Sequence, residues 1–85
     1  MARYFFHLHN DIDTHDEEGR ELPDIEAARL AAEEDARTMA AESVRAGHLD
    51  ITHCVTVTDE AGRHLFSVTF GEVVEIRGRR EPAAR

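Results

Sequence analysis

Residues 25–46 carry the strongest structural signal in this sequence. They contain no glycine or proline, and Gly47 follows them directly. Asp24, just after Pro23, is a good N-cap residue, and Gly47 suits the left-handed position that ends many helices. The sequence therefore predicts a helix over residues 25–46, about 33 Å long at a rise of about 1.5 Å per residue.

The apolar stripe of this helix is narrow and rich in alanine. With 100° between residues, one face gathers Ile25, Ala28, Ala32, Ala36, Met39, Ala40 and Ser43. Alanine lets a sheet approach closely but adds little buried area, so the core must be small. Leu30, Ala41 and Val44 fall to one side of the stripe, where we expect them to contact something other than the chain's own sheet.

The segment before the helix predicts a strand and a polar connector. Residues 3–9 alternate in character, which is typical of a half-buried strand. One face carries Tyr4, Phe6 and Leu8, and the other carries Phe5, His7 and His9. Residues 10–24 form an acidic connector, in which residues 18–22 could add a short edge strand.

Residues 53–59 and 63–70 predict a hairpin around a turn at Asp59–Gly62. Two registers are possible. A four-residue loop places Val55 and Val57 on the face of Phe66, Val68 and Phe70, whereas a three-residue loop with a glycine bulge places them opposite Leu65 and Ser67. We favour the first because it gives one apolar face. Residues 72–76 are expected to form a last short strand or extended edge.

Together these elements predict an α+β domain. It has a three- to four-stranded, mainly antiparallel sheet with one long helix packed on one face, in the order β-α-β-β. If the helix runs antiparallel to the first strand, that strand pairs beside residues 64–70. The domain spans residues 1–76, and residues 77–85 are expected to be a disordered basic tail that contains Arg77, Arg79, Arg80 and Arg85.

One helix covers only one face of a sheet, and this leaves the second face for another contact. In the favoured register the second face carries Phe5, His7, His9, Thr56 and Leu65. Such a mixture is too apolar for water and too polar for a core, and it is typical of a partner surface. We therefore expect a homodimer, formed across this face or by pairing of strand edges, because two-fold dimers are the commonest oligomers.

The charge of the chain limits its partners. Its 85 residues include 18 acids, 10 arginines and no lysine, for a formal net charge of −8. An acidic body repels nucleic acid phosphates and anionic lipids, so neither is an expected partner.

The single cysteine, Cys54, excludes an intrachain disulfide. With no segment suited to a membrane span or a signal peptide, we expect a cytoplasmic protein.

His7 and His9 are the main candidates for site chemistry. They lie two residues apart, so their side chains point the same way from a strand, and Asp11 follows them. Two imidazoles and a carboxylate could bind Zn²⁺ or another transition ion, while the simpler interpretation is polar filling of an open face. No pattern supplies a nucleophile beside a base in a sheltered cleft, so we expect no enzymatic activity and no cofactor.

Several segments together resemble a known family. They are Arg3–His9, Asp16–Ala28 and Asp59–Gly62, followed by Phe70 and Val73–Ile76. In this order they resemble a family of short bacterial proteins, mainly alphaproteobacterial, that is known only as a domain of unknown function. The resemblance covers residues 3–76 and implies a cytoplasmic bacterial protein, with no activity or catalytic residue to transfer. In one departure, Ile12 or Asp13 stands where a glycine is expected.

A looser likeness concerns Gly19 and Pro23–Ala28. A glycine turn and a Pro-Asp pair before an alanine-rich helix are similar to the antitoxin half of a bacterial toxin–antitoxin pair with a double-stranded-RNA-binding-like fold.

The sequence supports three hypotheses about function. The favoured one is a non-enzymatic protein-interaction domain that forms a homodimer. The others are a small metal- or ligand-binding protein that uses His7, His9 and nearby acids, and an antitoxin-like regulator.

Overall fold

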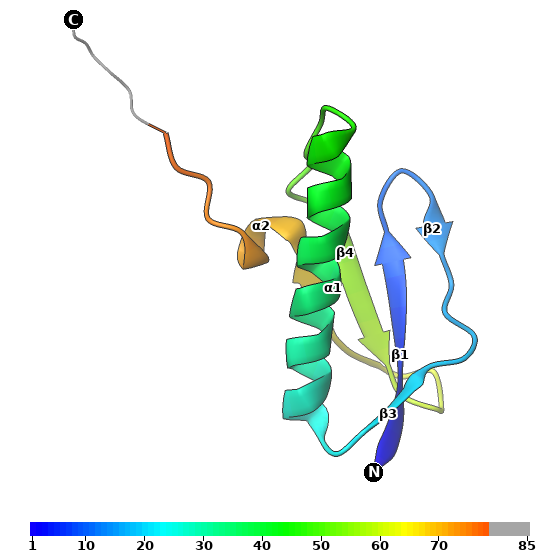
Figure 1. Cartoon of the computed structure of the whole chain (residues 1–85). Coiled ribbons are helices and arrows are strands. Elements are labelled where there is room, and N and C mark those ends of the chain that lie inside the picture. Colours follow the sequence, from blue (N-terminus) through cyan, green and yellow to red (C-terminus); the bar gives the residue numbers. More distant parts are fainter. Residues whose placement is uncertain (79–85) are drawn as a thin grey trace, which may run out of the picture.

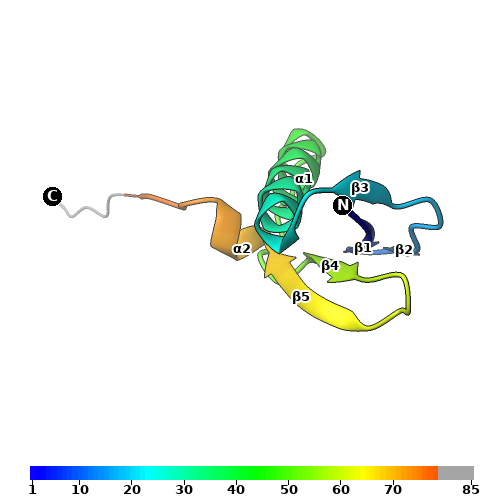
Figure 2. The ribbon, with the colours of Figure 1, turned by 90° about the horizontal axis from the view of Figure 1, so that it is seen from below.

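A computed structural model of the chain describes residues 1–78. Its elements are β1 (Ala2–His9), β2 (Asp13–Thr14), β3 (Arg20–Leu22), α1 (Ile25–Arg45), β4 (Cys54–Thr58), β5 (His64–Thr69) and α2 (Phe70–Val73). The sheet is five-stranded, with β2, β1, β4 and β5 side by side and β3 also paired with β1. α1 packs along one face of this sheet, and α2 lies beside α1 (Figures 1 and 2). The predicted α+β class, with one long helix on an antiparallel sheet, is confirmed.

α1 begins and ends where its flanking residues predict. The Asp24 carboxylate accepts a hydrogen bond of 2.9 Å from the Ala27 N–H, which satisfies one of the free donors of the first turn. Beyond the last turn, Gly47 has φ +102°, a conformation that glycine adopts without strain. Both ends of the helix are therefore set by local sequence.

The alanine stripe of α1 faces the sheet as predicted, and its fully covered members are Ala28, Ala32, Ala36 and Ala40. Aromatic and valine side chains from the strands and from α2 complete the core: Tyr4, Phe6, Val55, Val57, Phe66, Val68 and Phe70. Leu30 and Val44, beside the stripe, remain 66% and 58% exposed. They make no part of this core, in agreement with their position on the helix.

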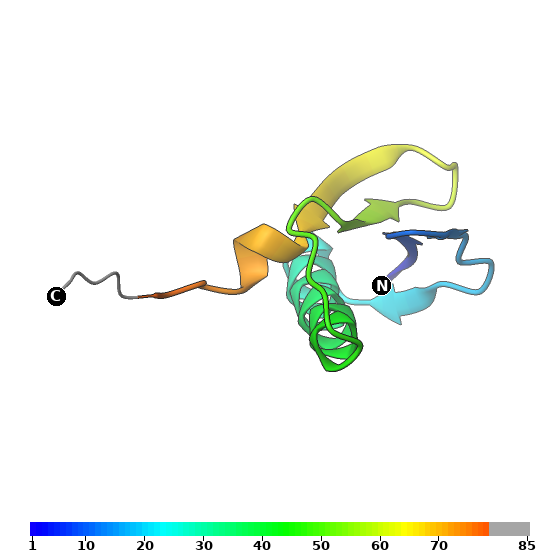
Figure 3. The ribbon, with the colours of Figure 1, turned by 90° about the horizontal axis from the view of Figure 1, so that it is seen from above.

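The pairing of β1 differs from the prediction. β1 pairs antiparallel with β4, with Phe6 opposite Val57, and it does not pair with β5. The connector explains the difference, because it forms β2 and β3 against β1 and returns the chain to the beginning of that strand (Figure 1). α1 therefore runs in the same direction as β1, and β4 runs opposite to it. Figure 3 shows both helices on one side of β4 and β5.

The hairpin of β4 and β5 has the predicted faces. Val55 lies opposite Val68, and Val57 lies opposite Phe66. All four side chains are buried in the core. The favoured assignment of faces is thus confirmed.

The turn of the hairpin differs from the favoured four-residue loop. The Asp59 N–H donates to the Arg63 carbonyl at 3.0 Å, across three residues, and Gly62 has φ +81°. The shorter loop alone would turn the side chains of β5 to the opposite faces of the sheet. The register shifts at the beginning of β5, and the one extra residue there returns them to the predicted faces. Leu65 lies at this shift and packs against the core. Its predicted place on the second face of the sheet is therefore wrong.

Residues 72–76 do not form the predicted strand. Phe70 begins α2, because the Thr69 hydroxyl caps the turn and accepts the Glu72 N–H at 3.2 Å. Phe70 is fully buried and anchors this turn to the core. Residues 74–78 contain no strand. The remainder of the predicted basic tail, with Arg79, Arg80 and Arg85, lies outside the described residues.

The second face of the sheet is not left bare. The connector folds over part of it, and the His15 ring stacks on the His7 ring with centroids 4.4 Å apart. His7 is only 8% exposed beneath this ring. Phe5, His9 and Thr56 on the same face are half-buried. The chain's own connector therefore covers the part of this face around His7, and the role of the face as a partner surface stays a prediction.

Candidate functional site

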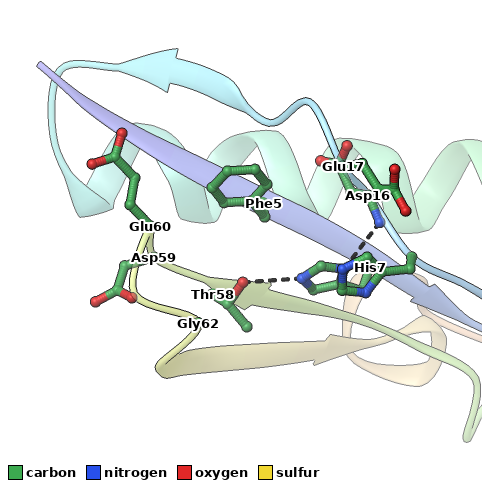
Figure 4. A pocket seen from close by; sticks show the side chains of 9 residues that line it. Phe5, His7, Asp16, Glu17, Thr58, Asp59, Glu60 and Gly62 are labelled. Carbon is green, nitrogen blue, oxygen red and sulfur yellow. Dashed lines mark hydrogen bonds between the residues drawn. The ribbon is translucent and has the colours of Figure 1, made fainter.

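His7 lies at the centre of a hydrogen-bonded cluster that joins β1, β4 and the connector. Its Nε2 lies 3.0 Å from Thr58 Oγ1, and its Nδ1 accepts the Asp16 N–H at 3.1 Å. Figure 4 shows both hydrogen bonds, with the His7 side chain between the two partners. His15 covers the ring from the connector side. The cluster therefore ties the connector to the two central strands.

These hydrogen bonds fix the tautomer of His7. A backbone N–H can only donate, so Nδ1 must present its lone pair to Asp16. The one proton of the neutral ring is then on Nε2, which donates to Thr58 Oγ1. In this state Nε2 cannot accept a proton from the Thr58 hydroxyl. The pair consequently lacks the arrangement of a nucleophile with its general base.

The surroundings of His7 oppose its protonation. Burial lowers the pKa of His7, because the charged ring would lose water, and nearby His15 and His9 lower it further. The Asp16 carboxylate acts in the opposite direction without outweighing them. The lowered pKa agrees with a neutral ring that accepts one hydrogen bond and donates the other.

Asp16 anchors the connector to the edge of β1. Its Oδ2 accepts the Phe6 N–H at 3.0 Å, and its Oδ1 accepts the N–H groups of Glu18 and Gly19 at 3.1 and 3.2 Å. Burial alone would raise the pKa of Asp16, but these backbone hydrogen bonds and His7 outweigh burial and lower it. The carboxylate thus accepts the Phe6 N–H in place of the backbone carbonyl that a neighbouring strand would supply.

A cavity of about 320 Å³ lies next to this cluster (Figure 4). Its lining comes from β1, the connector and the β4–β5 turn, and includes Phe5, Glu17, Thr58 and Glu60. Asp59 is in the same wall, and hydrogen bonding from the Arg63 backbone N–H lowers the pKa of its carboxyl group. The cavity is therefore lined by several carboxylates, beside the Phe5 ring and the imidazoles of His7 and His15.

The structure does not bring the predicted metal ligands together. His9 Nδ1 lies 3.1 Å from Asp13 Oδ1, and Asp11 Oδ1 lies 3.7 Å from His53 Nε2. Both ring nitrogens of His7 are already used. Across the described part of the chain, no three histidine, cysteine or acidic side chains form a group that could hold a metal ion. The turn after β1 places Asp13, and not Asp11, opposite His9.

Sequence reasoning assigned no functional role to His15 or Asp16. A local signal for Asp16 was present, because an aspartate shortly before a glycine is typical of a turn, and Gly19 has φ +70°. A Cβ atom on Gly19 would lie 2.9 Å from the Tyr4 carbonyl oxygen, so a side chain here would push the connector away from β1. The sequence signals the turn, but it does not signal the contact with β1.

The two edges of the sheet differ. Along the outer edge of β1, β3 pairs with Ala2–Tyr4, Asp16 accepts the Phe6 N–H, and β2 pairs with Leu8 and His9. At the other end of the sheet, β5 pairs with β4 alone. No strand of the described chain covers the outer side of β5 (Figure 2). This open edge and the His7 cluster are the two candidate functional features.

The architecture defines a small α+β domain with one closed and one open sheet edge. The chain belongs to the family described as Domain of unknown function (DUF6894), whose family model matches residues 3–71. This confirms the resemblance to a domain of unknown function. Searches among curated proteins and among solved structures found no match. Within residues 1–78, neither helix combines the length and the apolar character needed to cross a bilayer.

Proposed function

We propose that this chain is a non-enzymatic protein-interaction domain that works as a homodimer in the cytoplasm. The observation that carries the proposal is β5, a strand of six residues at the open edge of the sheet. An open edge presents backbone N–H and C=O groups that pair readily with another strand. Natural edges are commonly blocked by proline or by charged side chains, and residues 65–69 contain neither.

Exposed apolar side chains support a protein partner. Leu30 and Val44 of α1 are exposed beside the alanine stripe, and Ile76, beyond α2, is 67% exposed. Apolar surface of this kind favours association with another chain. The formal net charge of −8 supports a protein over a nucleic acid as the partner.

The state of His7 supports a structural role and not a catalytic one. One nitrogen accepts a hydrogen bond from the connector and the other donates to β4, so the ring holds three segments together. The Asp16 carboxylate beside it is occupied by three backbone N–H groups. We therefore propose that the cluster stabilises the closed edge.

A half-buried single cysteine, Cys54, suits a reducing compartment such as the cytoplasm.

Sedimentation velocity from micromolar to submillimolar concentration tests the proposal. We expect a species with twice the 9.6 kDa mass of one chain, which dissociates on dilution and is unchanged by added zinc. A mass of one chain at every concentration would contradict the homodimer. A dimer that forms only with zinc would instead favour the metal-binding alternative through His7 and His9.

A further inference from the structure

We infer that the dimer forms by antiparallel pairing of β5 with β5 of a second copy, through the backbone N–H and C=O of Ser67 and the backbone N–H of Thr69. The inference rests on the proposed function and adds to it the surface, the partner and the orientation. It joins the two sheets into one continuous sheet across the molecular two-fold axis.

Hydrogen bonding at the end of β5 shows which residues face β4. The Phe70 N–H donates to the His53 carbonyl at 2.7 Å. In an antiparallel ladder, alternate residues direct their backbone groups to the same neighbouring strand. Val68 and Phe66 are therefore bonded to β4 in the same way as Phe70.

Ser67 and Thr69 lie between these residues, so their backbone N–H groups point away from the sheet. The side chains agree with this alternation. Ser67 lies opposite Thr56, and their hydroxyl oxygens are 3.1 Å apart, as suits the close approach of a pair that exchanges no backbone hydrogen bonds. The outer edge of β5 therefore offers free donors at its centre and not only at a frayed end.

The charges along β5 favour a second copy as the occupant. Residues 65–70 carry no charge, so two chains of net charge −8 can approach at this edge. Arg63 precedes the strand and Glu72 follows it, and both are exposed. Antiparallel pairing brings Arg63 of one copy towards the partner's Glu72, and a two-fold axis repeats this contact. A parallel arrangement would instead place like charges side by side.

Pairing at this edge requires no change in the core. Val68, at the middle of the strand, is buried beneath the helices, whereas Ser67 is exposed on the other side of the sheet. The backbone groups that join β4 and β5 also stay in place. The monomer fold is therefore already suited to the dimer.

Substitutions at Ser67 test this surface. Ser67→Pro removes one outward N–H from each copy and leaves the hydrogen bonds to β4 intact, as proline at a strand edge allows. We expect the dimer dissociation constant to rise about tenfold or more. Ser67→Ala keeps the N–H and serves as the matched control, with a dissociation constant close to that of the wild type. Circular dichroism checks that each variant is folded.

Ser67→Lys is the second variant, for the case that proline prevents folding. It keeps the strand backbone, but it places a positive charge from each copy near the two-fold axis, which blocks edge pairing. We again expect about tenfold weaker dimerisation or more. If the wild type is a dimer and the folded Ser67 variants dimerise with the same affinity, β5 is not the dimer interface. The proposed homodimer would not be contradicted by that result. A monomeric wild-type chain would overturn the proposed function itself.

Discussion

The two edges of this sheet differ: the β1 edge is hydrogen-bonded to other segments of the chain, and the β5 edge is open. The β1 edge is closed along its length by β3, by the Asp16 carboxylate and by β2. The β5 edge has β4 on one side and no further strand among the described residues. The comparison teaches that a connector with two very short strands and one carboxylate is enough to close an edge. An edge left open in such a chain is available for a partner.

The largest effect is expected from the inward-facing half of β5. Val68→Pro removes an N–H that faces β4 and disturbs a side chain that is 1% exposed. We expect a loss of about 3 kcal/mol or more in the free energy of unfolding, measured by urea denaturation. Ser67→Pro, one residue away, should lose about 1 kcal/mol or less. Equal losses would show that the alternation along β5 is assigned incorrectly.

The next largest effect is expected at the closed edge. Asp16→Ala leaves the N–H groups of Phe6, Glu18 and Gly19 without their acceptor, and we expect a loss of about 2–3 kcal/mol in the free energy of unfolding. Asp16→Asn keeps one acceptor oxygen and should lose less. Glu17→Ala is the neighbouring control and should be close to the wild type. A stable Asp16→Ala variant would show that the edge is closed by β2 and β3 alone.

A smaller effect is expected from the close approach of the connector to β1. Gly19→Ala adds a Cβ atom 2.9 Å from the Tyr4 carbonyl oxygen at φ +70°, and should lose about 1–2 kcal/mol in thermal or urea unfolding. Gly47→Ala is the matched control, because Gly47 also has a positive φ but nothing within 4 Å of the added atom. Gly19→Ala should therefore be the more destabilised variant. The reverse order would contradict the tight contact at Gly19.

The smallest effect is a dependence of stability on pH. Because the pKa of His7 is lowered in the folded state, the unfolded chain binds the proton more readily, and stability falls as pH drops below about 6.5. Protonation of Nδ1 would also remove the hydrogen bond from the Asp16 N–H, because both groups would then be donors. The stabilisation from Asp16 is present above the ordinary aspartate pKa and is lost at lower pH, as pH falls through its lowered folded pKa.

His7→Asn isolates the histidine part of this pH dependence. It keeps an acceptor near the Asp16 N–H but has no titrating ring. Urea denaturation at a series of pH values should show a shallower decline for this variant below neutral pH. An identical decline in the wild type and the variant would assign the effect to the other histidines.

Local sequence signals predicted the elements whose causes are local. Asp24 and Gly47 mark the ends of α1, the alanine spacing identifies its buried face, and alternation identifies the faces of β1 and the hairpin. These features depend on the spacing of neighbouring residues and on their backbone preferences. They could be read without knowing how distant segments meet.

The features that sequence reasoning missed depend on distant contacts. β1 was expected beside β5, because the direction of α1 could not be known until the connector was seen to return along β1. Asp16 was assigned to an acidic connector, and its contact with the Phe6 N–H on β1 was not expected. The three-residue hairpin loop was considered but not favoured, because a shorter loop and an extra residue in β5 together give the same faces as a four-residue loop. No local pattern distinguishes that combination from a four-residue loop.

Hydrogen–deuterium exchange of backbone amides, followed by NMR at low and high protein concentration, compares the two edges most directly. We expect the Phe6 amide to exchange slowly at every concentration, because Asp16 holds it within the monomer. The amides of Ser67 and Thr69 should exchange rapidly in dilute solution and slowly once the dimer forms. Rapid exchange of both amides in a sample shown to be dimeric would contradict β5 as the site of pairing.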